Sequence, residues 1–181
     1  RWIQITKYAA VIALLVTSSL GVYSLLNTPE TQQMITANVK SGSKSEIILP
    51  DGTKVQLNGA TTITYDVNSS KQRLVQLSGE AFFDVAKNPD CPFRVIANGL
   101  QIEVVGTSFN VNTYKKGVVE TSLLTGQIKI SGGSLPQEYI LTPGEKATYS
   151  SINNALKITQ ADVHVETGWC DDYLKIGRAH V

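Results

Sequence analysis

Residues Leu49–Val85 read LPDGTKVQLNGATTITYDVNSSKQRLVQLSGEAFFDV and combine two tight turns with several strand-like runs. In the first turn, Pro50-Asp51-Gly52, proline presets φ, aspartate can accept a bond from its own backbone, and glycine tolerates positive φ. From Thr53 to Asn58, apolar and polar residues then alternate with the period of a strand. The second turn, Ser78-Gly79-Glu80, leads into a run with two adjacent phenylalanines, which must point to opposite faces of a sheet. This stretch therefore predicts a β-rich domain.

Strand-like runs continue from Val39 to about Thr159, and no ten-residue helical period interrupts them. The runs predicted as strands are 46–49, 54–57, 62–65, 73–77, 81–85, 93–97, 101–105, 109–114, 118–123, 127–131, 139–141, 146–149 and 156–159. We therefore expect an all-β domain rich in antiparallel pairs, either a sandwich or a β-solenoid. Turn glycines recur at Gly52, Gly79 and Gly106, and less regularly at Gly126 and Gly144. This spacing is typical of a stacked repeat, although hairpin-rich sandwiches also space glycines regularly.

The N-terminal part contains an uncharged apolar segment, residues 8–26, YAAVIALLVTSSLGVYSLL. At about 1.5 Å per residue it spans roughly 28 Å as a helix, close to the thickness of a bilayer core. Arg1 and Lys7 precede it and Glu30 follows it, so the positive-inside rule places the N-terminus in the cytoplasm. A cleaved signal peptide and a buried helix are the alternatives. The length, the lack of an A-x-A site and the lack of a polar stripe favour a membrane helix before the β domain.

Composition excludes several classes of function. Charged residues are 17% of the chain and the formal net charge is +1, which argues against nucleic-acid binding. The two cysteines, Cys91 and Cys170, lack the spacing of a zinc or redox motif, and they could form a disulfide or remain separate thiols. His164 lies in an alternating Val-His-Val run and is predicted to be an outward strand residue. Without a histidine base, serine and threonine cannot form a nucleophilic catalytic set.

The central carboxylates Asp51, Glu80 and Asp84 each have a structural interpretation: a turn residue, a strand start and an outward strand position. No cluster of metal ligands is present in the sequence, and no cofactor is predicted. The chain is therefore predicted to bind a partner and not to be an enzyme. Strand addition at an exposed sheet edge is one mode of recognition. The glycine of Gly106-Thr107-Ser108-Phe109 could also let another backbone approach closely, or it could form only a bulge or bend between consecutive strands.

Six elements in order resemble the FecR family of transmembrane anti-sigma regulators, in the form found in Bacteroides-type bacteria. They are Leu49–Val55 with Leu57-Asn58, Arg73–Val75 with Leu77–Val85, Pro92–Val95, Val105–Val111, Leu124–Ile128 and Leu141–Glu145. Within this resemblance we expect twelve residues to define the structural motif. These residues are Pro50, Asp51, Gly52, Gly79, Glu80, Asp84, Gly106, Thr107, Phe109, Gly126, Pro143 and Gly144.

The resemblance implies a layout and partners. A cytoplasmic N-terminal segment would hold an extracytoplasmic-function sigma factor, and a single inner-membrane helix would connect it to a periplasmic FecR domain. The signal would come from the signalling domain of a TonB-dependent transporter in the outer membrane. The alternative is a membrane-anchored β-sandwich that binds glycan or another envelope component, which would need exposed aromatic side chains.

This layout divides the chain into six segments and makes it a fragment. The segments are a cytoplasmic juxtamembrane remnant (1–7), the membrane helix (8–26), a linker (27–38), the FecR-like β domain (39–159), the start of a connection to a missing C-terminal domain (160–175) and a final segment (176–181). The last segment, IGRAHV, is expected to be a translated sequencing adapter and not part of the fold.

Overall fold

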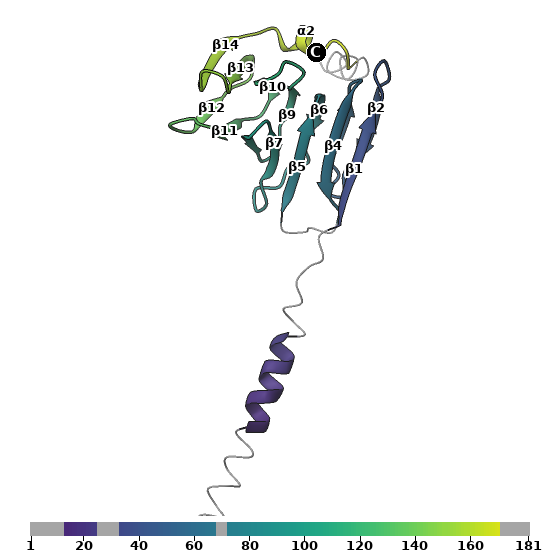
Figure 1. Ribbon diagram of the computed structural model, residues 1–181, viewed down its shortest axis with the longest axis vertical. Coiled ribbons are helices and arrows are strands. Elements are labelled where there is room, and N and C mark those ends of the chain that lie inside the picture. Colours follow the sequence, from purple (N-terminus) through teal and green to yellow (C-terminus); the bar gives the residue numbers. More distant parts are fainter. Residues whose placement is uncertain (1–12, 25–32, 68–71, 171–181) are drawn as a thin grey trace, which may run out of the picture. The chain divides into compact units, whose positions relative to one another are not determined.

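The computed structural model describes residues 13–24, 33–67 and 72–170. The chain divides into two compact units, Arg1–Thr31 and Gln32–Val181. In the first unit, residues 13–24 form a helix (Figure 1). Within the described ranges, no helix has both the length and the apolar character needed to cross a membrane. The membrane helix predicted over 8–26 extends at both ends past the described residues, so it stays a prediction, and segment 176–181 also lies outside them.

The described part of the second unit consists of fourteen strands followed by one short helix. The strands are β1 (Met34–Val39), β2 (Ser45–Ile48), β3 (Lys54–Leu57), β4 (Thr61–Asp66), β5 (Arg73–Ser78), β6 (Glu80–Asp84), β7 (Phe93–Ala97), β8 (Leu100–Val104), β9 (Ser108–Asn112), β10 (Val118–Thr125), β11 (Ile128–Gly132), β12 (Tyr139–Leu141), β13 (Glu145–Ser150) and β14 (Ala155–Gln160). The helix is α2 (Val163–Glu166).

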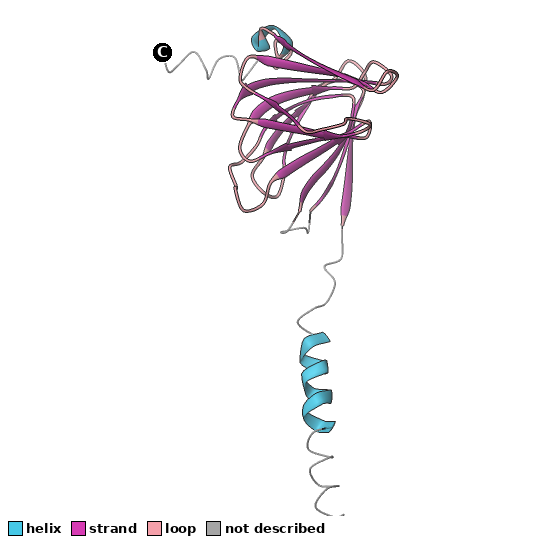
Figure 2. Ribbon diagram, turned by 90° about the vertical axis from the view of Figure 1, so that its left-hand side faces the viewer, coloured by secondary structure: helices cyan, strands magenta, loops and turns pink. Residues whose placement is uncertain are grey.

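The strands form two seven-stranded sheets that share one core. Sheet A has the order β1-β4-β5-β7-β8-β11-β12, and sheet B has the order β14-β13-β10-β9-β6-β3-β2. Figure 2 shows the two layers of strands. One hydrophobic cluster includes Ile63 and Val95 from sheet A and Val55 and Phe109 from sheet B, all fully buried. The unit is therefore an all-β sandwich, one of the two architectures predicted from the sequence. Among the described strands, only β5 and β7 pair in parallel.

The chain alternates between the two sheets, and glycines mark several of the crossings. Gly79 links β5 to β6, Gly106 links β8 to β9, Gly126 links β10 to β11, and Gly144 links β12 to β13. Gly52, in contrast, lies in the β2–β3 hairpin within sheet B. The regular glycine spacing in the sequence thus reflects a chain that passes repeatedly from one layer to the other, which gives the sandwich a repetitive character.

Two sequence predictions need correction. The linker predicted over 27–38 ends earlier, because β1 pairs with β4 from Met34↔Asp66 to Val39↔Thr61. An edge strand with mostly exposed side chains shows little hydrophobic alternation, which explains the error. The strand predicted around His164 is instead helix α2. The Asp162 carbonyl accepts bonds from the amides of Val165 and Glu166, and this closes a helical turn.

The two adjacent phenylalanines of β6 are both buried, on opposite faces. Phe83 belongs to the shared core and stacks on Phe109, with ring centroids 5.2 Å apart. Phe82 is also only 1% exposed but is not part of that cluster. Both faces of sheet B are therefore covered at β6, and this central strand reads as a run of buried residues instead of an alternating pattern.

Candidate functional site

A buried arginine, Arg73, makes several contacts at one end of the segment Leu49–Val85. Arg73, at the start of β5, is 9% exposed, and its Nη1 lies 3.0 Å from Oδ2 of Asp51 in the β2–β3 turn. It also donates to three carbonyls, those of Cys91 at 2.7 Å, Ala86 at 2.7 Å and Asn88 at 3.2 Å. Arg73 therefore fastens the β2–β3 turn and the β6–β7 loop to sheet A. We call this group the Arg73 node.

The turn itself holds Asp51 in place for this contact. Oδ1 of Asp51 accepts the amide of Thr53 at 2.9 Å, and Oδ2 accepts the Thr53 hydroxyl at 2.8 Å. The Gly52 amide donates to the carbonyl of Leu49, which closes the turn around Pro50. The Arg73 guanidinium also lies 5.7 Å from the centre of the Phe93 ring, within range of a cation–π contact.

A second polar cluster, the Glu80 node, contains a carboxylate and, among the described residues, no cation. Glu80 is 7% exposed, and its side chain accepts bonds from Asn58 Nδ2 at 2.7 Å and from Asn110 Nδ2 at 3.0 Å. Its backbone amide and carbonyl both bond to the Thr61 hydroxyl. The Oδ1 atom of Asn110 is buried without a hydrogen-bond partner among the described residues. Glu80 thus joins β6 to β9 and to the end of β3 through neutral groups.

The two nodes do not come together. In the pairing of β3 with β6, Lys54 faces Asp84 and Leu57 faces Ala81. Asp51 lies before the first of these positions and Glu80 beyond the last, so they lie beyond opposite ends of the ladder. Asp84 instead accepts a bond from the Ser108 hydroxyl at 2.8 Å. The structure therefore gives the three central carboxylates separate structural roles, with Asp51 in a turn, Glu80 at the start of β6 and Asp84 at its end.

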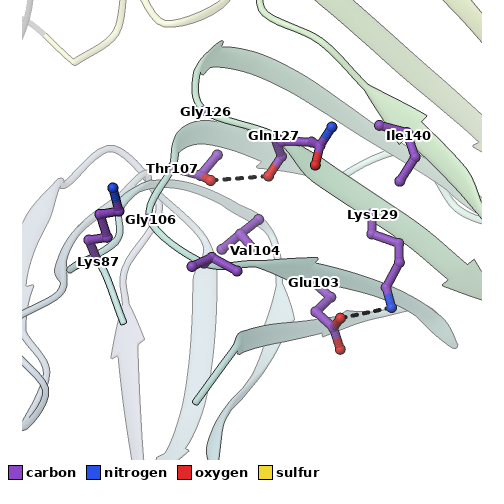
Figure 3. A pocket seen from close by; sticks show the side chains of 10 residues that line it. Lys87, Glu103, Val104, Gly106, Thr107, Gly126, Gln127, Lys129 and Ile140 are labelled. Atoms are coloured by element: carbon purple, nitrogen blue, oxygen red, sulfur yellow. Dashed lines mark hydrogen bonds and ion pairs between the residues drawn. The ribbon is translucent and has the colours of Figure 1, made fainter. Parts of the chain in front are cut away.

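A pocket of about 400 Å³ lies where β8 ends and β11 begins, beside β12 and two crossing glycines (Figure 3). Gly106 packs against the stem of Lys87, and a Cβ added at Gly106 would come 2.8 Å from Lys87 Cβ. A Cβ at Gly126 would come 2.7 Å from the Thr107 hydroxyl and 2.8 Å from the carbonyl of Gly106. Of the two interpretations of Gly106, the structure shows both: this glycine lies in the bend between β8 and β9, and the backbone and stem of Lys87 pack against it.

A row of paired residues on the outer side of sheet A leads to this pocket. Glu103 faces Arg94 across one ladder and Lys129 across the other, and Lys129 in turn faces Ile140. Glu103 accepts from Lys129 Nζ at 2.9 Å and from Arg94 Nε at 2.8 Å. The hydrogen bond from Lys129, followed by that from Arg94, holds the pKa of Glu103 below its usual range. The same bond raises the pKa of Lys129.

The chain after β14 is attached to sheet B by a lysine of that sheet. Lys146 of β13 bonds Glu166 of α2 at 3.0 Å and Glu120 of β10 at 3.2 Å. Burial lowers the pKa of Lys146, but the hydrogen bonds to Glu166 and Glu120 outweigh it and raise the pKa overall. Lys44 also donates to the carbonyl of Trp169. These contacts attach to the domain the segment that was predicted to lead out of it. In the described ranges, no disulfide joins Cys91 to Cys170.

The remaining motif residues have local roles. Phe109 is a core residue, and the Thr107 hydroxyl donates to the carbonyl of Gln127 at 3.1 Å. The turn at Pro143-Gly144 closes with a bond from the Glu145 amide to the Thr142 carbonyl. The Glu145 side chain accepts from the Thr142 amide and hydroxyl, and these bonds lower the pKa of Glu145.

Sequence reasoning assigned no role to Arg73, Asn58, Asn110 or Lys87. A signal existed for Arg73, because Arg73, Val75 and Leu77 share the buried face of β5 and a charged residue at an inward position needs a partner. The others have no local signal, since their partners come from distant parts of the chain.

Comparison with known proteins gives a consistent assignment. The family model described as FecR protein matches residues 35–129. No curated protein matches the sequence. Two crystal structures of a Parabacteroides distasonis ATCC 8503 protein assigned as an anti-sigma factor are similar, with TM-scores of 0.71 and 0.70, each at 30% identity. They cover 76% and 75% of this chain, and the chain spans 65% and 64% of theirs, so it corresponds to about two thirds of those proteins.

Proposed function

Because the chain belongs to the FecR family, we propose that it is part of a transmembrane regulator of an extracytoplasmic-function sigma factor. The observation that carries the proposal is the family match over 35–129, which covers β1 to β10 and the start of β11. The similarity to the Parabacteroides anti-sigma factor structures supports the same conclusion. FecR proteins are regulatory and not enzymatic, so the prediction that the chain is not an enzyme is confirmed by its family.

The proposed signal comes from a TonB-dependent transporter in the outer membrane. Its signalling domain contacts the periplasmic sandwich, and the change passes through a single inner-membrane helix to the sigma factor in the cytoplasm. The charge-free run over 8–26, with Arg1 and Lys7 before it, supports this orientation. The sigma factor is bound by a cytoplasmic segment on the N-terminal side of Arg1, and the chain itself does not contact nucleic acid.

The topology is tested with reporter fusions. Alkaline phosphatase joined after Thr31 is expected to be active, and the same reporter joined after Lys7 is expected to be inactive, because the enzyme folds only outside the cytoplasm. Equal activity of the two fusions would reject a single-pass helix with a cytoplasmic N-terminus.

The regulatory function is tested by gene deletion. Deleting the full-length gene is expected to change transcription of a neighbouring TonB-dependent transporter, and a plasmid copy is expected to restore it. A copy that lacks the sequence before Arg1 is the matched control, and it is expected not to restore regulation. A deletion strain in which no transporter transcript changes would contradict the relay. Capture of a sigma factor by the full-length protein separately tests the partner.

A glycan-binding role has less support in the described sandwich. Sugar binding uses exposed aromatic faces, and among the exposed large hydrophobic side chains of the described second unit the only aromatic is Tyr114. Its hydroxyl already donates to the carbonyl of Gly59. The described exposed surface therefore has no cluster of aromatic rings on which a sugar could stack.

A further inference from the structure

We propose that the pocket between Gly106 and Gly126 binds an acidic, aliphatic peptide segment of a partner protein. Its volume of about 400 Å³ lies within the range of known ligand sites, roughly 300–1,000 Å³. That space accommodates one or two side chains of an extended peptide. Backbone from the two crossings forms part of its wall, because Gly106 and Gly126 both line it.

Lys87 supplies the charge that selects a carboxylate. It is exposed, and it makes no ion pair in the part of the chain that the structure describes. Its Cα, Cβ and Cγ atoms all lie within 2.9 Å of the position that a Gly106 Cβ would occupy. The stem of the side chain is therefore held against the pocket wall, so less conformational entropy is lost when the ammonium group meets an anion.

The other charges of the pocket neutralise one another. Lys129 and Arg94 both bond to Glu103, and Figure 3 shows the Glu103–Lys129 pair across the pocket from Lys87. Lys129 also approaches Glu138 at 3.6 Å. Glu103 is thus already satisfied by two cations and repels an incoming carboxylate only weakly. Lys87 remains as the unmatched positive charge, and one such charge suits a carboxylate better than a polyanion.

Two exposed apolar side chains supply the second part of the specificity. Val105 is 39% exposed and Ile140 is 47% exposed, and both line the pocket. An aliphatic residue next to the carboxylate would cover them and remove apolar surface from water. Combined with the exposed backbone at the crossings, this favours a peptide over a small free anion, because a free anion leaves Val105 and Ile140 uncovered.

The site is tested by nuclear magnetic resonance on the full chain in detergent micelles, labelled at glycine. The probe is the capped peptide acetyl-Gly-Glu-Val-Glu-Val-Gly-amide, and the comparison peptide replaces both glutamates by glutamine. We expect the acidic peptide to shift the Gly106 and Gly126 signals with saturation. The glutamine peptide is expected to bind about three- to fivefold more weakly, the effect of one partly exposed ion pair.

The substitution Lys87→Gln keeps the stem against Gly106 and removes the charge. It is expected to abolish the preference for the acidic peptide, whereas Lys87→Arg keeps it. Lys157→Gln, at an exposed position of β14, is the matched control and is expected to change nothing. Equal binding of the two peptides, absence of shifts at both glycines, or a full response by Lys87→Gln would overturn the proposal. Equal shifts with disodium glutarate would indicate a small-anion site and would overturn the peptide assignment.

Discussion

The Arg73 node and the Glu80 node lie beyond opposite ends of the β3–β6 ladder and satisfy buried polar groups in different ways. Asp51 forms an ion pair with the Arg73 guanidinium, which also donates hydrogen bonds to three backbone carbonyls. The Glu80 carboxylate accepts hydrogen bonds from the side-chain amides of Asn58 and Asn110, its only partners among the described residues. The first arrangement joins a hairpin turn and a loop to a strand, and the second joins neighbouring strands of one sheet. Charge is thus paired where irregular backbone must be held, while neutral donors suffice where a ladder already fixes the spacing.

The largest expected effect is at the Arg73 node. Arg73→Met keeps the length of the side chain but removes the cation that pairs with Asp51, which then keeps only its two bonds from Thr53, and it leaves three carbonyls without the guanidinium donor. We expect a loss of about 3–5 kcal/mol in the free energy of unfolding, the usual cost of breaking a buried ion pair. Urea unfolding of the full chain in micelles, followed by circular dichroism, measures it.

Arg94→Met is the matched control for this experiment. Its side chain is 41% exposed and makes one ion pair, with Glu103, so the expected loss is below about 1 kcal/mol. If the two substitutions had equal effects, Arg73 would not be the residue that fastens the turn and the loop to sheet A.

The next largest effect on the free energy of unfolding is expected at one of the two turn glycines. Gly52 and Gly79 both have positive φ, +83° and +113°, but only Gly79 is crowded, because an added Cβ would lie 2.5 Å from the Thr61 hydroxyl. Gly79→Ala is expected to cost about 3 kcal/mol from backbone strain and steric overlap together. Gly52→Ala is expected to cost about 1 kcal/mol from strain alone. Similar losses measured by urea unfolding would mean that the crossing at Gly79 can relax.

A smaller effect is expected for charge removal at the Glu80 node. In Glu80→Gln the new amide would face one of the asparagine donors, but Asn110 can rotate and present its unpartnered Oδ1 as an acceptor. We therefore expect a loss of about 1 kcal/mol or less in the free energy of unfolding. Glu80→Ala, which leaves both asparagine amides without an acceptor, is expected to lose about 2–3 kcal/mol. A large loss in Glu80→Gln would show that the negative charge itself is needed.

These two nodes also show how far the sequence could predict the structure. Alternation of apolar residues predicted the strands of the core, because each buried face repeats every second residue, and the residues Pro50-Asp51-Gly52 predicted the turn. It missed β1, whose exposed side chains carry little alternation. The partners of Glu80 come from residues 22 and 30 positions away, and such pairs depend on the order of strands in the sheets. Lys87 near Gly106 depends in the same way on how two loops meet, so the pocket had no signal in the sequence.

Glu103 extends the comparison to a carboxylate that pairs with two cations more exposed than itself, and its replacement is expected to have the smallest effect on stability. Its pKa is lower in the folded state than in the unfolded state, where it is about 4.3. The stabilisation is therefore complete above that pH and is lost as the pH falls through the folded pKa. Glu103→Gln is expected to lower the free energy of unfolding at neutral pH by about 0.5–1 kcal/mol.

The pH dependence separates this contribution from a packing effect. Below about pH 4 the difference between the native protein and Glu103→Gln is expected to shrink, because the native carboxyl becomes protonated. High salt is expected to reduce the difference at neutral pH, since screening weakens exposed ion pairs. A difference that stays constant from neutral to acidic pH would show that the Arg94–Glu103–Lys129 contacts stabilise sheet A by packing and not by paired charge.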